Sequence, residues 1–124
     1  MSKSVIIIPT YNEIGNIDIT LKKIESLSEK FDVIIVDDNS PDGTAEFVEK
    51  AINSKLYTLK IHLIKRKGKN GLGTAYIAGF KKSLKLNYDY IFQLDCDGSH
   101  DPNQLIELIN ELKSNNCDIV VGSR

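Results

Sequence analysis

Short apolar runs alternate along this chain with longer stretches in which apolar residues recur at helical spacing. The apolar runs are rich in valine and isoleucine, and most lack intervening polar residues, as in strands buried on both faces. They predict strands over residues 4–8, 32–36, 58–65, 90–94 and 118–121, the first of them stopped by Pro9. Strands separated by helices in this way predict an α/β fold with a mostly parallel sheet and helices on both faces. The pattern does not specify the order of the strands.

The stretches between the apolar runs predict four helices. Each repeats apolar residues every three or four positions, which places those residues on one face of a helix. The four faces consist of Ile17, Leu21 and Ile24; Ala45, Val48 and Ile52; Leu72, Ala75, Tyr76, Phe80 and Leu84; and Leu105, Leu108, Ile109 and Leu112. Asp101 followed by Pro102, with Gln104 three residues after the aspartate, predicts the start of the fourth helix.

Composition excludes several classes of protein. A chain of 124 residues has room for one domain. Its net charge of -1 gives no support to a nucleic-acid partner bound through bulk positive charge. No apolar run approaches the roughly 18 residues that span a bilayer, and none resembles a signal peptide. The two cysteines, Cys96 and Cys117, suit a reducing compartment, so we expect a cytoplasmic protein.

Polar and charged residues follow every predicted strand. In an open parallel sheet the carboxyl ends of the strands form the edge at which ligands bind. The segments expected at this edge are residues 9–13, 37–38, 65–69 and 95–97 together with Arg124. We therefore expect the functional site there.

Asp95 and Asp97 form the most specific motif of this edge. Two carboxylates one residue apart at a strand end can share a divalent cation with a substrate, and oxygen ligands favour Mg²⁺ or Mn²⁺. Aspartate is also frequent in turns, so the pair alone does not establish a metal site. Cys96 lies between the two acids and does not suit these metals, because thiolates prefer softer ions.

Two further segments have both a structural and a functional interpretation. Asp37 and Asp38 either cap the helix that begins near residues 42–44 or offer a carboxylate to the N–H groups of a nucleotide base. The basic segment 65–69 is either a solvated loop or a source of cations for a diphosphate. The glycines between residues 68 and 73 complete neither a P-loop nor a dinucleotide-binding fingerprint.

These motifs, taken in order, resemble those of the family 2 glycosyltransferases with the GT-A fold, and most of all the polyprenyl- or dolichyl-phosphate mannosyltransferases. The matching segments are 5–13 (VIIIPTYNE), 36–44 (VDDNSPDGT), 71–75 (GLGTA), 95–102 (DCDGSHDP) and 122–124 (GSR). The first two segments indicate the broad family. The glycine-rich segment and the string that begins at Asp95 indicate the lipid-phosphate branch.

The resemblance implies a donor-binding pocket for a nucleotide sugar. The residues that it places there are Pro9, Tyr11, Glu13, Val36, Asp38, Arg66, Lys69, Cys96 and Arg124. Within this set Asp38 would hold the base beside Val36. Arg124, assisted by Arg66 and Lys69, would contact the donor phosphates.

The resemblance also implies the catalytic groups and the reaction. Asp95 and Asp97 would bind the metal, Mg²⁺ or Mn²⁺, and the donor diphosphate, with Ser99 joining the metal shell. The implied reaction is an inverting, metal-dependent transfer of mannose from GDP-mannose to a dolichyl or polyprenyl phosphate at a membrane surface. The acceptor phosphate is already ionised, so the main catalytic contribution would be stabilisation of the leaving diphosphate. We expect no nucleic-acid partner and a peripheral location at the cytoplasmic membrane face.

Catalytic domains of this family continue past the Gly-Ser-Arg segment at which this chain ends. Residues 1–124 are therefore expected to form a single nucleotide-sugar-binding domain that is truncated at its C-terminus. A partner chain or the missing C-terminal half would complete the acceptor side. The alternatives are another family 2 transferase, which uses UDP-glucose or a related donor, and a donor-binding fragment without activity. A phosphoreceiver domain is a third, disfavoured alternative, because residues 9–13, 65–66 and Arg124 stand where that fold needs an acid pair, an aspartate and a lysine.

Overall fold

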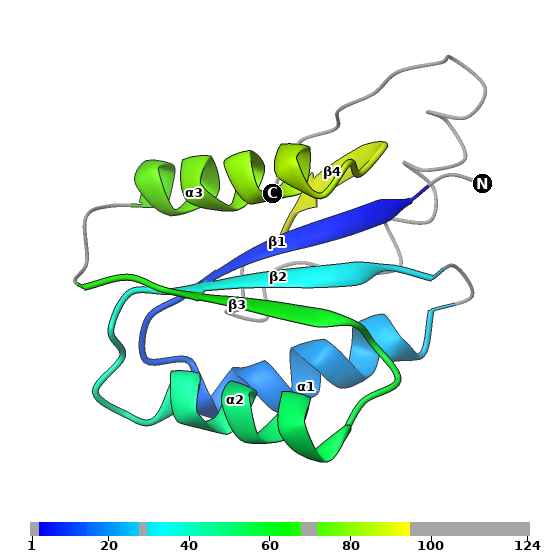
Figure 1. Cartoon of the computed structure of the whole chain (residues 1–124). Helices are drawn as coiled ribbons and strands as arrows, with labels where there is room; N and C mark the ends of the chain where they lie inside the picture. The colour runs from blue at the N-terminus through cyan, green and yellow to red at the C-terminus, as the bar shows by residue number, and fades with distance from the viewer. Residues whose placement is uncertain (1–2, 28–29, 68–71, 95–124) are drawn as a thin grey trace.

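The structure, a computed structural model, describes residues 3–27, 30–67 and 72–94. A parallel sheet forms its middle layer and helices lie on both faces, as the sequence predicts (Figure 1). The strands are β1 (Ser4–Thr10), β2 (Asp32–Asp37), β3 (Ile61–Lys65) and β4 (Tyr90–Gln93). The helices are α1 (Ile14–Glu25), α2 (Thr44–Ser54) and α3 (Leu72–Lys85). The helix predicted near residues 101–112 and the strand predicted at 118–121 lie outside the described residues.

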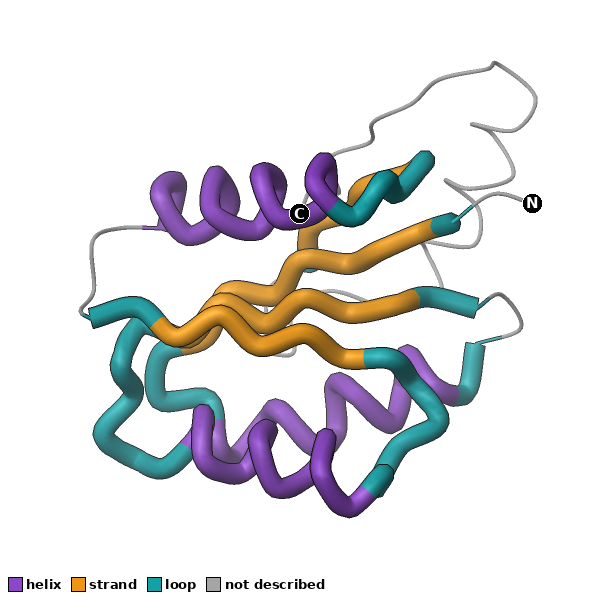
Figure 2. Tube along the Cα trace, viewed as in Figure 1, coloured by secondary structure: helices purple, strands orange, loops and turns teal. Residues whose placement is uncertain are grey.

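The strands of the described sheet lie in the order β3-β2-β1-β4. The chain moves outward from β1 through β2 to β3, and then returns past β1 to place β4 on its other side. Because crossovers between parallel strands are right-handed, a reversal of direction moves the connecting helix to the other face of the sheet. Accordingly α1 and α2 cover one face and α3 covers the opposite face (Figure 2).

The core is divided by the sheet into two apolar clusters. Successive side chains of a strand point to opposite faces, so Ile6 and Ile8 pack toward α1 and α2. Val5 and Ile7, from the same strand, pack on the face of α3. Both sets are fully buried, which explains why the first strand is an unbroken run of Val and Ile.

Helix α3 lies close against β1 because a glycine faces it. A Cβ atom on Gly79 would lie 2.5 Å from the Cγ2 atom of Ile7, closer than atoms can approach. The buried hydroxyl of Ser83 donates to the carbonyl oxygen of Gly79 at 2.8 Å, so this hydroxyl has the hydrogen-bond partner that a buried polar group needs. Small residues therefore set the distance between α3 and the sheet.

The first strand does not stop at Pro9, as predicted, but continues to Thr10. The carbonyl of Ile7 accepts the N–H of Leu94 on the β4 side, whereas the carbonyl of Thr10 accepts the N–H of Asp38 on the β2 side. Alternate residues of a strand face the same neighbour, so Pro9 faces the β4 side with Ile7. Its missing N–H therefore costs no bond to β2, and the strand continues.

The third strand is shorter than predicted and starts at Ile61 instead of residue 58. Its predicted first residue is bonded elsewhere: the N–H and hydroxyl of Thr58 both donate to the Glu25 carboxylate, at 2.5 and 3.0 Å. Thr58 thus bonds to the end of α1, whereas Lys60, directly before β3, accepts the N–H of Val33 in β2 at 2.9 Å. Alternation of apolar residues in the sequence did not distinguish these two arrangements.

Candidate functional site

The carboxyl ends of three strands form one edge of the sheet. Thr10, Asp37 and Lys65 lie side by side at the ends of β1, β2 and β3. The loops that follow these strands are the segments in which the sequence predicts a donor site. Leu94, whose N–H donates to Ile7 at 3.0 Å, is the last described residue before the predicted acid pair.

The carboxylate of Asp37 has a structural role at this edge, because it holds the end of β1 and the loop after β2 together. Its side chain is buried, and its Oδ1 atom accepts the hydroxyls of Thr10 and Ser40 at 2.7 and 2.6 Å. Its Oδ2 atom accepts the N–H of Ser40 at 2.9 Å. These three bonds use both oxygens, as a buried carboxylate requires. Of the two interpretations of the Asp37–Asp38 pair, the structural one describes Asp37, but through a turn and not through a helix cap.

The loop after β1 is held by side chains of the loop after β2. The Ser40 hydroxyl accepts the N–H of Asn12 at 2.9 Å, and the Thr44 hydroxyl accepts the N–H of Glu13 at 3.1 Å. Asn12 and Asn39 have φ angles of 57° and 59°, a left-handed conformation that asparagine tolerates better than most residues. The two loops therefore form one bonded unit at the edge of the sheet.

The helix cap that the sequence places at Asp37 or Asp38 is made by Asp42. Its Oδ1 atom accepts the N–H of Thr44, the first residue of α2, at 3.0 Å. Its Oδ2 atom accepts the N–H of Ile14, the first residue of α1, at 3.1 Å. Burial alone would raise the pKa of Asp42, but the hydrogen bonds from Thr44 and Ile14 outweigh it and hold this pKa below its ordinary value.

Asp38 and Arg66 form an ion pair between the ends of β2 and β3. Arg66 Nε lies 2.6 Å from Asp38 Oδ1, and the side chains are only 8% (Asp38) and 13% (Arg66) exposed. Arg66 Nη2 donates to Asp38 Oδ2 at 3.3 Å and to the Thr74 hydroxyl of α3 at 2.8 Å. Among the described residues, neither Asp38 Oδ1 nor Arg66 Nε has a hydrogen-bond partner of good geometry. The structure thus brings two of the predicted site residues into direct contact through their side chains.

The other predicted donor residues in the described chain differ in exposure. Tyr11 is 38% exposed beside the edge, and Glu13 and Pro9 are half-buried. Val36 is fully buried and packs in the cluster on the α3 face. Its side chain therefore belongs to the core beneath the edge, whereas Tyr11 is accessible for stacking.

The remaining predicted site residues are Lys69, Asp95, Cys96, Asp97, Ser99 and Arg124, and they lie outside the described residues. Within residues 3–27, 30–67 and 72–94, no cluster of three or more acidic, histidine or cysteine side chains could hold a metal ion. The metal site is therefore a prediction that depends on Asp95, Asp97 and Ser99. In the same part of the chain, no helix has the length and apolarity to cross a bilayer.

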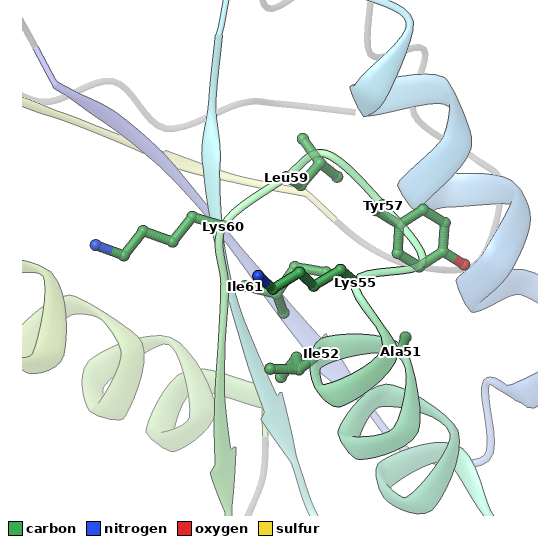
Figure 3. Close-up of a pocket in the computed structure, with 7 residues that line it drawn as sticks. All are labelled: Ala51, Ile52, Lys55, Tyr57, Leu59, Lys60 and Ile61. Atoms are coloured by element: carbon green, nitrogen blue, oxygen red, sulfur yellow. The ribbon is translucent and has the colours of Figure 1, made fainter.

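Two cavities open at the opposite edge of the sheet. The smaller, of about 210 Å³, lies between the end of α2 and the start of β3 (Figure 3). It is lined by Ala51, Ile52, Lys55, Tyr57, Leu59, Lys60 and Ile61. The larger, of about 430 Å³, lies beside it and shares Leu59 and Lys60. Neither of these two cavities is lined by a predicted donor residue.

Sequence reasoning missed the residues that hold the site together. They are Thr10, Ser40, Asp42, Thr44 and Thr74, all short polar residues close to a strand end or a helix start. Such residues commonly cap helices and bond to turns, which is the one signal that could have found them. Their partners lie on other elements, so the sequence does not identify the partners.

The family profile described as Glycosyl transferase family 2 matches residues 5–124. The chain is 42% identical over 118 residues to an undecaprenyl-phosphate mannosyltransferase from Micrococcus luteus, and 34% identical over 122 residues to a polyprenol monophosphomannose synthase from Mycolicibacterium smegmatis. These alignments cover 95% and 98% of this chain but 46% and 45% of the relatives. The chain thus spans about half the length of the curated relatives it matches.

Solved structures show the same fold. A crystal structure of residues 1–349 of S. aureus TarS in complex with UDP-GlcNAc matches 92% of this chain and 32% of its own, with a TM-score of 0.74 and 23% identity. A crystal structure of the same TarS segment in complex with UDP gives a TM-score of 0.70 at 22% identity, and covers 92% of this chain and 33% of its own. The expected GT-A fold is confirmed. With the family profile matching nearly its whole length, this chain belongs to glycosyl transferase family 2.

Proposed function

We propose that this member of glycosyl transferase family 2 is the nucleotide-sugar-binding part of a polyprenyl-phosphate mannosyltransferase. The observation that carries the proposal is the Asp38–Arg66 pair, nearly buried at the carboxyl edge of the sheet beside the loop that bears Tyr11. The printed names of the two relatives supply the class of acceptor and sugar. The donor that we propose is GDP-mannose.

The chemistry of Asp38 supports a guanine nucleotide. Guanine offers two adjacent N–H donors to a carboxylate whereas uracil offers one. Both oxygens of Asp38 contact Arg66, so the base would share this carboxylate with the guanidinium. Tyr11, exposed beside this edge, would stack on the base. Asp37 is not proposed to bind the donor, because its oxygens are bonded to Thr10 and Ser40.

The donor phosphates and the metal are assigned to residues outside the described part of the chain. Asp95, Asp97 and Ser99 would hold Mg²⁺ or Mn²⁺, and their carboxylate and hydroxyl oxygens are the ligands that these metals prefer. The metal would stabilise the negative charge that develops on the leaving diphosphate. Arg124 and Lys69 would add positive charge to the same phosphates.

The proposed transfer is a single displacement. An oxygen of the acceptor phosphate bonds to the anomeric carbon of mannose while the bond from that carbon to the diphosphate breaks, so the configuration inverts and GDP leaves. The acceptor phosphate is ionised near neutral pH, so no proton needs to be removed from it. A lipid acceptor would bring the protein to the cytoplasmic membrane face. A partner chain, or sequence equivalent to the rest of the relatives, would complete the acceptor side.

The first test is calorimetric titration of the 124-residue chain with GDP-mannose and with UDP-glucose, each with and without Mn²⁺. Circular dichroism first establishes that the chain is folded. We expect binding of GDP-mannose that needs Mn²⁺. Preferential binding of UDP-glucose would replace the proposed donor, and no binding of either donor by a folded chain would refute the proposed function.

The metal assignment and the transfer are tested separately. Asp97→Ala should abolish the Mn²⁺-dependent part of GDP-mannose binding, whereas Asp89→Ala, an exposed acid outside the proposed site, should leave it unchanged. Binding that survives Asp97→Ala would remove Asp97 from the metal site. Radiolabelled mannose supplied as GDP-mannose with a short polyprenyl phosphate in detergent then reports transfer. Donor binding without any labelled lipid would indicate a donor-binding fragment.

A further inference from the structure

Arg66 joins three elements of the sheet edge. Its N–H donates to the carbonyl of Asp37 at 2.8 Å, which fixes its backbone beside the end of β2. Its guanidinium reaches Asp38 on one side and Thr74, in the first turn of α3, on the other. The side chain thus spans from the sheet to the helix on its α3 face.

The Arg66 guanidinium is held from two sides, by Asp38 Oδ1 at 2.6 Å from Nε and by the Thr74 hydroxyl at 2.8 Å from Nη2. Arg66 Nη2 lies 2.8 Å from the Thr74 hydroxyl and 3.3 Å from Asp38 Oδ2, so its shorter contact is with the threonine. An arginine side chain has several rotatable bonds and loses considerable conformational freedom when it is held in one arrangement. A planar guanidinium anchored at Nη2 keeps its Nε edge toward Asp38, because the fork of donors is rigid.

We propose that Thr74 is a positioning residue of the donor site: its hydroxyl holds the Arg66 guanidinium against Asp38 and so fixes the Asp38 carboxylate in the orientation that accepts a nucleobase. This inference rests on the proposed function, because it assumes that Asp38 binds the base. It assigns Thr74 an effect on the nucleoside end of the donor and none on the phosphates. In this arrangement Arg66 orients the Asp38 carboxylate and does not bind the diphosphate of the donor.

The binding test uses Thr74→Val, which keeps the shape of the side chain and removes the hydroxyl, with Thr74→Ser as the variant that restores it. The probes are GDP and inorganic pyrophosphate, each titrated calorimetrically in Mg²⁺ into the 124-residue chain. We expect Thr74→Val to weaken GDP binding about tenfold, the effect of losing one hydrogen bond to a charged group. Pyrophosphate binding should stay within about twofold of the wild-type value, and Thr74→Ser should restore GDP binding.

Two results of this titration would overturn the proposal. Unchanged GDP binding by Thr74→Val would show that the hydroxyl positions nothing. An equal loss for GDP and pyrophosphate would show that Arg66 acts on the phosphates.

A second measurement separates this inference from the proposed function. Arg66 Nε is buried 2.6 Å from Asp38 Oδ1, so its N–H group should give a signal distinct from that of a solvated arginine in proton–nitrogen NMR spectra of the chain without nucleotide. Thr74→Val should broaden it or move it to the position of a solvated arginine, and Thr74→Ser should retain it. An unchanged signal in Thr74→Val overturns the positioning role. A wild-type chain that shows the signal but binds neither probe refutes the proposed function while the contact itself stands.

Discussion

The carboxylate of Asp42 caps a helix that begins 28 residues earlier in the chain, because its Oδ2 atom accepts the backbone N–H of Ile14 at 3.1 Å. Its other oxygen accepts the N–H of Thr44 at the start of α2. The first N–H groups of a helix have no partner within the helix, and here one side chain serves two helices. Asp42 therefore joins the loops that carry Tyr11 and Asp38.

Asp42→Ala should destabilise the fold although the residue is exposed. Loss of a helix cap costs about 1–2 kcal/mol, and this variant removes a cap from both α1 and α2. Urea denaturation should show a lower midpoint with little change in slope. Asp42→Asn retains one oxygen acceptor and should lie between the wild type and the alanine variant. An alanine variant as stable as the wild type would contradict the shared cap.

Asp37→Asn should destabilise the chain by about 1–3 kcal/mol, since an amide group would face a hydroxyl or N–H donor in a buried position. The wild-type carboxylate accepts from Thr10 and from both donors of Ser40. Asp89→Asn is the control, because Asp89 is exposed and accepts the N–H of Lys3 at the opposite edge of the sheet. Equal stabilities of the two variants would show that Asp37 is not a structural acid.

Gly79→Ala should lower the free energy of unfolding by about 1–3 kcal/mol, the usual cost of overpacking a core. The new methyl group would meet the Cγ2 atom of Ile7, which is itself fixed in the core. Gly73→Ala is the matched variant on the same helix, since nothing lies within 4 Å of its added Cβ. It should stabilise α3 by up to about 1 kcal/mol. Thermal unfolding of both variants measures this contrast: the unfolding temperature should fall in Gly79→Ala and rise in Gly73→Ala.

His62→Gln should make the stability less sensitive to acid. Burial lowers the pKa of His62 below its ordinary value of 6.5, and Lys60, Lys82 and Lys3 add to this while Asp32 opposes it. The hydroxyl of Tyr88 also faces this ring, with 3.4 Å between its oxygen and His62 Nε2. The folded state therefore holds fewer protons on His62 than the unfolded state does.

The stabilisation from neutral His62 is complete above about pH 6.5 and is lost as the pH falls through the lower, folded-state pKa. Urea denaturation at pH 8 and pH 5.5 measures the loss. The difference between the two pH values should be smaller in His62→Gln than in the wild type. The same difference in both proteins would assign the acid sensitivity to other groups.

The elements were predictable where their signals are local. Burial of a strand on both faces requires apolar residues at successive positions, and the runs around Ile6 and Ile34 show this directly. The helices were equally clear, since Ile17, Leu21 and Ile24 share one face of α1. The boundaries of β1 and β3 differ from those that the sequence predicts. Whether a strand continues past Pro9 depends on which neighbour the residue faces, and that is set by pairing with other strands.

The candidate site was predictable only as a position in the fold. Because the carboxyl ends of parallel strands meet at one edge, the sequence by itself places Tyr11, Asp37, Asp38 and Arg66 together. It does not show which of Asp37 and Asp38 has a structural role and which is available to the donor, because the two residues are identical and adjacent.

Only the tertiary structure distinguishes the two acids. Asp37 is bonded to Thr10 and Ser40, whereas Asp38 meets Arg66, which Thr74 holds from α3. Secondary structure depends on residues a few positions apart, so the sequence determines the α/β alternation and the edge at which the loops lie. The role of a buried carboxylate depends on the donors that the folded chain brings to it from distant segments, and those donors are decided by strand order and helix packing.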